Sequence, residues 1–592
     1  LHDTLLETIY AEASRLAERA VDREDAAEKL PWERTLDRLL TSRLFGFPLM
    51  LLLLAMVFWI TVAGANVPSA WLSALLVEHG HAWLRGLGEA AGLPAWLLGL
   101  AMFATMISSV TVVAYPADAY KSAYLRWIGT LMLPLGVYIG WKFFLPFYRR
   151  NRCTSAFEYL ESRFGAGIRT YVSATFTIAQ LLRIATILYL VSLVFQQMTG
   201  ASAYACILMG GLAITVYAVL GGARGIVWAQ FFQVFLLWFG SIVLFLTVIR
   251  GIEGGIPAVF RIGWAHDKFM LGDLNAATGA IEPVAWFSLR DKAILMMLIT
   301  GLAGWIFEYS ANQDVVQKYV SAKDPKAAFK SIWICCLCSV PTWAFFMFLG
   351  TALYVFFLQH PDPQAQAILT GAGGAKAESI LPYFCVKMVP TGLAGIVIAG
   401  ILAAAMASSS ATISSISAVF ITDIYRRHLA KSASERHYVT AARATTAASC
   451  LLMMGGASLF YTLSDLTLQD LLMKIASISS GGILGVYVLG FLTTRGSSRS
   501  VAIGIGATIL FSAWIAAVEF LGLSPEHIAH ALGCSVRTAG ILLKPVHIYY
   551  VGFFGQILTF LVAYILSSLF EPKRDLTGLT FWTQITPGPG EE

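Results

Sequence analysis

An arginine stands near the middle of a long apolar segment. Arg183 lies within AQLLRIATILYLVSLVF, too far from either end of this stretch for its guanidinium to reach water easily. An ionisable side chain at membrane depth is costly unless it is paired or hydrated, so such a residue is a candidate for function. A guanidinium matches a carboxylate in shape and charge. Arg183 therefore indicates either recognition of an organic anion, such as an acidic sugar or carboxylate, or a structural bond to an internal partner.

A carboxylate occupies a second apolar segment. Glu308 lies in GWIFEYSANQD. It could pair with Arg183, accept a proton or hydrogen-bond a hydroxylated solute. Each of these roles would require Glu308 to face the interior of a helix bundle rather than lipid.

Hydroxyl side chains gather in a third apolar segment, AAAMASSSATISSISAVFITDIYRR, at residues 403–427. Neutral oxygens from hydroxyls and from carbonyls at a helix break are suitable ligands for a sodium ion without its water. Small hydroxyl residues also allow membrane helices to pack closely. The residues alone leave both interpretations open.

Other patterns argue against an enzyme. Cys335, Cys336 and Cys338 lie in an apolar segment without a nearby His or carboxylate, which favours buried thiols over a metal cluster. The GGARG sequence lacks the Gly-Lys-Ser/Thr ending of a phosphate-binding loop. The ten His residues show no ligand spacing. We expect no catalysis and no metal other than a transported or coupling cation.

The composition is that of a polytopic membrane protein. The chain has 592 residues, of which 57% are hydrophobic and only 13% are charged, whereas soluble proteins carry about 25% charged residues. The formal net charge of +6 does not point to nucleic acid, because the basic residues cluster in short segments between apolar spans. We expect an all-α protein in a lipid bilayer with about 13 transmembrane helices. The predicted spans are 46–64, 97–114, 126–147, 170–198, 203–220, 226–250, 293–311, 328–357, 391–421, 439–463, 468–492, 500–521 and 547–569.

The positions of the basic residues predict an orientation. Clusters of Arg or Lys follow the third, seventh, ninth, eleventh and last spans. If the spans alternate in direction, all five clusters fall on one side, which the positive-inside rule identifies as cytoplasmic. The C-terminus is then inside the cell.

Five motifs in a fixed order resemble the sodium:solute symporter family. They are residues 403–427 together with MISSVTVVAYPADAY (106–120), FEYLESRFG (157–165), GGARGIVWAQFFQVF (221–235) and NQDVVQKYVSAKD (312–324). The resemblance covers residues 93–570. It implies the LeuT-type fold, in which two inverted five-helix repeats place broken helices around a site at the bilayer midplane.

The resemblance implies a sodium site between the first and eighth core helices. Its ligands would be the carbonyls of Ala104, Ile107 and Ala404 and hydroxyls at positions 407 and 408. Ser408 keeps one hydroxyl, but Ala407 lacks the other. Where many members of the family carry Thr-Asp, this chain has Ala229-Gln230, and Ala411 follows Ser410 at a second hydroxyl pair. These departures favour one sodium ion over two, and they leave a weak site or another coupling ion open.

The resemblance also implies the solute-binding residues. Sialic acid carriers of the family bind the substrate carboxylate with an arginine at a place similar to that of Arg183. Thr111 occupies a sugar-contact position in the sodium/galactose carriers. Glu308 aligns with their gating tyrosine, and its neighbour Tyr309 is aromatic. Asn312 matches a family amide near the same helix.

The first hundred residues differ from this family. Residues 1–92 contain a charged amphipathic arm and one apolar span, and they resemble the region where the arm of bacterial ferrous iron transport protein B meets its first membrane helix. The resemblance suggests a fusion, with the symporter core at 93–570 and a cytoplasmic tail at 571–592. The basic residues before span 46–64 favour a cytoplasmic N-terminus, whereas the alternation of the later spans favours an external one.

The sequence thus predicts a secondary active transporter in a bacterial inner membrane. It would couple a cation, most simply sodium, to symport of a small organic solute by alternating access. An uncoupled facilitator or a transporter-like sensor is the alternative, because one sodium hydroxyl is missing. A ferrous iron transport component is a remote third reading. The sequence does not indicate the oligomeric state.

Overall fold

The structure is a computed structural model. It describes residues 95–150, 156–220, 222–275, 278–320, 322, 324–463, 474–477, 481–521, 533, 535–543, 546–572, 576 and 578–583. The segment 1–92, with predicted span 46–64 and the resemblance to the iron transporter, lies outside the described residues, so those readings stay predictions.

The described residues are almost entirely helical. The first half contains α6 (Ala95–Met106), η2 (Val110–Ala114), α7 (Tyr115–Lys121), η3 (Arg126–Met132), α8 (Leu133–Ile139), η4 (Gly140–Phe144), α9 (Leu145–Arg150), α10 (Glu158–Phe164), α11 (Ala166–Thr199), α12 (Ala203–Leu220), α13 (Gly222–Arg250) and α14 (Gly255–Ala265). A two-stranded antiparallel sheet follows, made of β1 (Gly272–Leu274) and β2 (Ile281–Pro283). The second half contains α15 (Ile294–Ser310), α16 (Gln313–Val320), α17 (Pro325–Gln359), α18 (Pro363–Thr370), η5 (Ala372–Gly374), η6 (Ala377–Ser379), α19 (Ile380–Met388), α20 (Thr391–Val419), η7 (Phe420–Leu429), α21 (Glu435–Leu463), α23 (Ile483–Leu492), α24 (Ser498–Leu521), α26 (Val536–Leu543), α27 (Tyr550–Phe570) and η8 (Phe581–Thr583).

The helices follow the predicted spans. Each span after 46–64 coincides with a described helix or helix pair, although 468–492 is described only in part. Eight helices of the described residues are long and apolar enough to cross a membrane, or nine if the bent pair α6 and η2–α7 counts as one span. This number is lower than 13 partly because α12, α15 and α23 are shorter apolar helices. The prediction of an all-α membrane protein is confirmed.

Two helices are interrupted where the resemblance predicts broken helices. The segments Ala95–Met106 and Val110–Lys121 meet at an angle of 59°. In the other broken helix, α15 ends at Ser310, and α16 begins at Gln313 after a short break. Such breaks expose backbone carbonyls and amides, which is tolerated at membrane depth only inside the protein.

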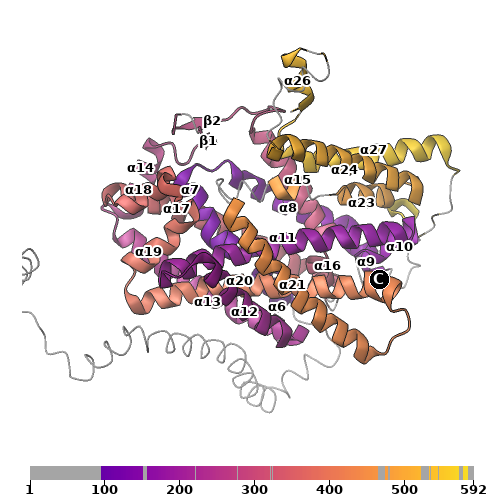
Figure 1. Cartoon of the computed structure of the whole chain (residues 1–592), viewed down its shortest axis with the longest axis horizontal. Coiled ribbons are helices and arrows are strands. Elements are labelled where there is room, and N and C mark those ends of the chain that lie inside the picture. Colours follow the sequence, from indigo (N-terminus) through magenta and orange to yellow (C-terminus); the bar gives the residue numbers. More distant parts are fainter. Residues whose placement is uncertain are drawn as a thin grey trace, which may run out of the picture. The chain divides into compact units, whose positions relative to one another are not determined.

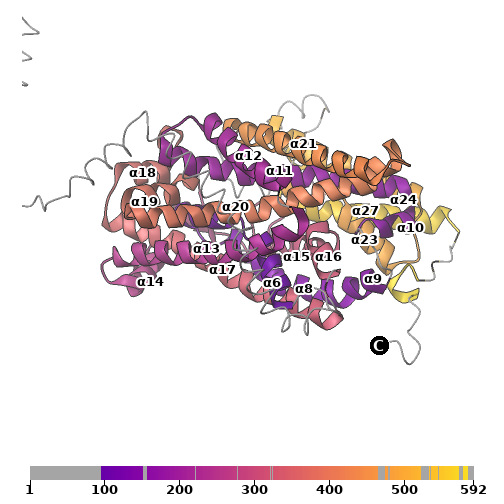
Figure 2. The same ribbon diagram turned by 90° about the horizontal axis from the view of Figure 1, so that it is seen from below.

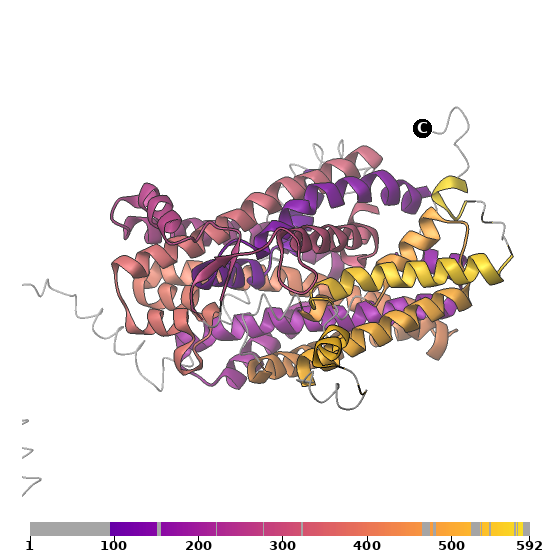
Figure 3. The same cartoon turned by 90° about the horizontal axis from the view of Figure 1, so that it is seen from above.

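Long helices lie side by side and are joined by close glycine contacts. Helix α13 packs along α20, α6 along α17 and α11 along α21 (Figure 2). A Cβ atom at Gly400 of α20 would lie 3.0 Å from the carbonyl oxygen of Leu236 in α13. Small residues at such crossings let membrane helices approach closely. Helices α24 and α27 form another adjacent pair (Figure 3).

The loops separate into two groups at opposite ends of the described bundle. Helices α14, α18 and α19 lie at one end, and α9 and α10 lie at the other (Figure 1). At the second end, Arg163 of α10 donates to the carbonyls of Thr493 and Arg495 at 3.2 and 2.5 Å. Arg427 bonds to Glu161 of α10. Basic segments that are far apart in the sequence therefore meet at one end, as the positive-inside argument requires.

Candidate functional site

A cavity of about 380 Å³ opens beside Arg183. Its walls come from α11, α15, α27, residues 475–477 and the start of α23. Most of its lining is apolar, with aromatic rings such as those of Phe307 and Tyr549. Its polar side chains are Gln180, Arg183, Thr300, Glu308, Asn312, Ser477 and Gln556. An apolar cleft with a few converging polar groups is the usual form of a small-molecule site.

Arg183 and Glu308 face one another in this cavity. A guanidinium nitrogen of Arg183 lies 3.9 Å from a carboxylate oxygen of Glu308, and the two side chains are 30% and 16% exposed. This separation is longer than that of a charge-assisted hydrogen bond, which is about 2.7–2.9 Å. Arg183 thus has a carboxylate nearby that balances its charge and still has donors that reach the cavity.

The break between α15 and α16 adds amide groups to the cavity. The Asn312 side chain donates to Glu308 at 2.7 Å and accepts from Gln180 at 3.3 Å. Its carbonyl oxygen also accepts the backbone N–H of Asp314 at 3.0 Å, so it caps the start of α16. Asn312 thus holds the Glu308 carboxylate through Oε2, whereas Arg183 lies nearest to Oε1.

Two predicted solute contacts lie elsewhere. The indole N–H of Trp343 in α17 donates to the Thr111 hydroxyl at 3.3 Å, and Thr111 is only 2% exposed. Tyr309 is fully buried, and its hydroxyl bonds to the Cys335 sulfur at 3.7 Å. Neither residue lines the cavity. The structure therefore brings Arg183, Glu308 and Asn312 together but not the other two.

The predicted ion ligands lie where α6 ends and where α20 runs past it. The helical ladder includes the bond from Ile107 N to Phe103 O and resumes with Val112 N to Ser108 O. The carbonyls of Ala104 and Ile107 fall between these acceptors, where the ladder is interrupted. Such carbonyls can turn toward a cation.

The α20 part of the predicted site is buried. Ser408 is fully buried, and its hydroxyl donates to the Ala404 carbonyl at 3.1 Å. Ala404 and Ala407 are 3% and 1% exposed. The Ala407 carbonyl accepts a bond of 3.0 Å from the side-chain amide of Gln230 in α13.

These oxygen ligands fit a sodium ion. They are neutral oxygens in a buried place, which sodium accepts without a counter-charge. Among the described residues, the Gln230 side-chain carbonyl and the Ser409 hydroxyl are buried without a hydrogen-bond partner. Unsatisfied buried oxygens are costly and indicate a missing partner such as an ion or water. The Gln230 amide already bonds to the Ala407 carbonyl, so a sodium ion beside Ala407 would give the Gln230 oxygen a partner.

Sequence reasoning missed Thr105 and Lys318. The Thr105 hydroxyl accepts from Gln230 at 3.3 Å and also bonds to the Lys318 ammonium. Lys318 belongs to the basic cluster after the seventh predicted span, which the positive-inside rule assigns to a loop at the cytoplasmic end. Its helix, α16, has strongly separated polar and apolar faces, a pattern that ordinarily turns the polar face away from the core, so the sequence carried no signal that Lys318 bonds to α6.

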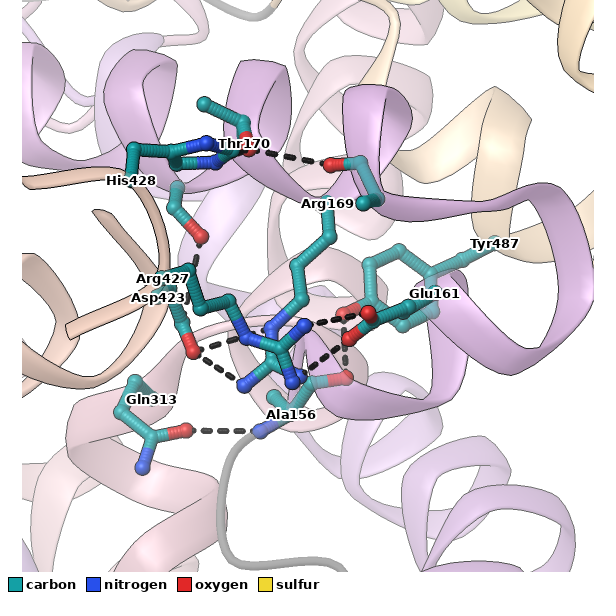
Figure 4. A network of polar contacts seen from close by, with 11 residues as sticks. Ala156, Glu161, Arg169, Thr170, Gln313, Asp423, Arg427, His428 and Tyr487 are labelled. Atoms are coloured by element: carbon teal, nitrogen blue, oxygen red, sulfur yellow. Dashed lines mark hydrogen bonds and ion pairs between the residues drawn. The ribbon is translucent and has the colours of Figure 1, made fainter. Parts of the chain in front are cut away.

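A buried ionic network joins helices at the end of the bundle that contains α10 (Figure 4). Arg169 at the start of α11 donates to Asp423 of η7 at 3.0 Å and to Glu161 of α10 at 2.7 Å. Asp423 is completely buried and also accepts from Ser173 at 3.1 Å. Although burial raises the pKa of Glu161, hydrogen bonds from Arg169 and Arg427 lower it below its ordinary value. The network holds the ends of α10, α11 and η7 together.

The same end is tied to α16. The Gln313 side chain accepts the backbone N–H of Ala156 at 2.8 Å, and Tyr487 of α23 donates to the carbonyl of Ala156 at 2.7 Å (Figure 4). The segment before α10 is therefore fixed to both α16 and α23.

Comparison with known proteins agrees with this architecture. The chain is similar to the sodium/sialic acid symporter SiaT of Proteus mirabilis, with 30% identity over 72% of this chain and 82% of that protein. It is 28% identical to the sodium/sialic acid symporter NanT of Aliivibrio fischeri, over 72% of this chain and 80% of the relative. A solved structure of a Na⁺-coupled sialic acid symporter in a substrate-bound outward-open state superposes with a TM-score of 0.68. That match has 26% identity and covers 88% of this chain and 99% of the other.

The predicted fold is thereby confirmed, and the chain is a multi-pass integral membrane protein. The family model for the sodium:solute symporters matches residues 90–504. This range includes both interrupted helices, the Arg183–Glu308 cavity and the Ser408 region. The chain belongs to the sodium:solute symporter family.

Proposed function

We propose that this protein is a non-enzymatic secondary active transporter that couples sodium entry to uptake of an acidic sugar across a bacterial inner membrane. The observation that carries the proposal is the pairing of Arg183 with Glu308 in one cavity. The relatives SiaT and NanT, which are named as sodium/sialic acid symporters, support the substrate class.

The cavity suits a solute with a carboxylate and hydroxyl groups. Arg183 is the charged donor, and a bidentate bond to a carboxylate would be stronger than its loose contact with Glu308. Glu308, Asn312 and Gln180 offer acceptors and donors for hydroxyl groups. Apolar lining from α15 and α27 would cover the carbon skeleton.

The closed cytoplasmic network gives a mechanism for alternating access. Arg169, Asp423 and Glu161 must separate before the cytoplasmic end can open. Binding of the ion and the solute can drive this change only if both bind the two conformations with different affinity. The proposed ion site would lie between α6 and α20, and the cavity is lined by α11 and α15. Helix α16, which follows the break at Asn312, contacts both α6 and α20, and Asn312 accepts a bond from Gln180 of α11. A movement at this break would therefore affect both sites.

Transport into proteoliposomes tests the proposal. We expect a sodium gradient to accelerate uptake of N-acetylneuraminic acid, and we expect its methyl ester, which lacks the negative charge, to compete poorly. Uptake of the acid that is independent of every cation gradient would favour the uncoupled facilitator, whose specific support is the missing hydroxyl at Ala407. Preferential uptake of neutral sugars would contradict the proposed substrate class.

A further inference from the structure

The short helix α16 contacts α6 through a lysine. The Lys318 ammonium donates to the carbonyl of Ala101 at 3.3 Å and bonds to the Thr105 hydroxyl. Both acceptors belong to α6, and Thr105 is adjacent to the predicted ion ligand Ala104. A lysine from the other interrupted helix therefore reaches the helix that ends at the ion site.

Lys318 belongs to a chain of bonds that surrounds this site. The Thr105 hydroxyl also accepts from the Gln230 amide at 3.3 Å, and that amide donates to the Ala407 carbonyl at 3.0 Å. Through Lys318, Thr105, Gln230 and Ala407, the four helices α16, α6, α13 and α20 are linked. The link passes through Gln230, where many members of the family carry an aspartate, and through Ala407, where the resemblance implies a hydroxyl.

The ammonium brings a positive charge without a bonded carboxylate. Among the residues that the structure describes, no Asp or Glu lies within ion-pair distance of Lys318, although the more distant carboxylates of Asp314 and Glu308 attract its charge. The carboxylate one turn earlier on the same helix, Asp314, accepts a bond from Thr412 of α20 at 3.1 Å. The oxygens that receive the ammonium are neutral, like those that would bind sodium.

We propose that the Lys318 ammonium is a tethered cation that competes with the coupling sodium ion and positions α16 against α6. This inference rests on the proposed sodium coupling and adds its regulation. A fixed positive charge close to the site lowers the affinity for sodium, because like charges repel strongly where water is excluded. Lys318 also holds the C-terminal half of α6 in place when sodium is absent, because its bonds to Ala101 and Thr105 need no ion.

Lys318 would act at the moment when sodium leaves its site. When sodium leaves, the ammonium still bonds the Ala101 carbonyl and the Thr105 hydroxyl, so these two oxygens beside the site keep a partner in the empty transporter. Lys318 must move away from Thr105 whenever α16 separates from α6. Lys318 is thus a positioning residue that sets the sodium affinity, rather than a ligand of the solute.

Sodium-dependent thermal stabilisation of the purified full-length protein tests this inference without any solute. Lys318→Met removes the ammonium, and Lys318→Gln removes the charge but keeps an N–H donor. We expect both variants to reach half-maximal stabilisation at a sodium concentration about tenfold lower than the wild type. Lys318→Arg, which keeps the charge, should stay within about twofold. The matched control is Lys330→Met, which removes an exposed lysine of α17 and should leave the sodium dependence unchanged.

A second measurement separates a structural effect from the proposed one. At saturating sodium, KM for the solute should be unchanged in Lys318→Gln, because Lys318 does not line the cavity. An unchanged or higher sodium requirement in both neutral variants would overturn the inference, as would an equal effect of Lys318→Arg. If the wild type binds sodium but transports no acidic sugar, the proposed substrate fails, whereas the sodium shift of the Lys318 variants still decides this inference.

Discussion

Arg183 of α11 and Glu308 of α15 lie in one cavity with a nitrogen–oxygen separation of 3.9 Å. The two residues are 125 positions apart in the sequence, yet their charges balance inside an apolar bundle. Because the contact is loose, the guanidinium can take a stronger carboxylate partner from a solute without first breaking a short ion pair. This relationship leads directly to the first two predictions.

Replacement of Arg183 by Lys or Ala should weaken solute binding. A hydrogen bond to a charged group contributes about 1.5–3 kcal/mol, so KM for an acidic solute should rise about 10- to 100-fold in Arg183→Ala. Arg183→Lys should lie between that variant and the wild type, since lysine keeps the charge but loses the planar pair of donors. Uptake kinetics at fixed sodium measure this effect. An unchanged KM in Arg183→Ala would exclude a role in binding the carboxylate.

Replacement of Glu308 by Gln should have the opposite effect on binding of the acid. The amide keeps the size and the contact with Asn312, but it no longer competes with the solute carboxylate for Arg183. We expect affinity for the acid to rise about two- to tenfold, on the scale of a partly exposed ion pair, and affinity for the methyl ester to change less. Isothermal titration with both compounds makes the comparison, and weaker binding of the acid would show that Glu308 itself holds the solute.

A serine at position 407 should strengthen the ion site. Ala407→Ser restores a hydroxyl next to Ser408 on α20, in a buried region where the neighbouring groups are neutral oxygens. We expect the sodium concentration for half-maximal uptake to fall about three- to tenfold, because one neutral-oxygen contact is worth about 1 kcal/mol. The matched control is Ala418→Ser, further along the same helix and exposed. Equal sodium dependence in both variants would place the ion elsewhere.

Some of the site follows from the sequence, and some requires the three-dimensional structure. Arg183 and Glu308 were predictable because a charge in an apolar segment must face the protein interior. Helical geometry alone does not exclude Tyr309, because the adjacent residues Phe307 and Glu308 both line the cavity. The structure excludes it, since the Tyr309 hydroxyl bonds to Cys335 of α17 instead. Lys318 could not be assigned from its neighbours, because its acceptors Ala101 and Thr105 lie more than 200 positions earlier. The basic segments around Arg163 and Arg427 do meet at one end through Glu161 of α10, whereas the cytoplasmic orientation that they suggest stays a prediction.

Loss of the Asp423 charge should destabilise the closed cytoplasmic end. Asp423→Asn leaves Arg169 buried with only Glu161 as a carboxylate partner. Breaking a buried pair by removing one charge costs about 3–5 kcal/mol. We expect a lower Tm in detergent and greater labelling of a cysteine introduced at Ser173, which bonds to Asp423 and is buried in the closed state. The control is Glu435→Gln. Because the contact of Glu435 with Arg426 is exposed, this substitution should change neither Tm nor the labelling.

Protein stability should depend on pH through Lys268, in the loop between α14 and β1. Its ammonium donates to the carbonyls of Tyr120 and Ser122 at 2.7 and 3.2 Å. Burial lowers the pKa of Lys268 to about 7, although the nearby Asp118 raises it. In the unfolded chain the pKa of lysine is about 10.4. Between these values the unfolded state binds more protons, so this residue makes the free energy of unfolding rise with pH.

The matching experiment compares Tm of the wild type and Lys268→Met from pH 7 to pH 9. The advantage of the wild type over the variant should grow as the pH rises, by at most ~1.4 kcal/mol per pH unit. Lys387→Met is the control, because hydrogen bonds from Lys387 to Asp362 and Tyr383 raise its pKa. Lys387 stays protonated in both states over this range, so its contribution should not change with pH. A constant or shrinking difference for Lys268→Met would mean that its buried amine keeps its proton throughout this range.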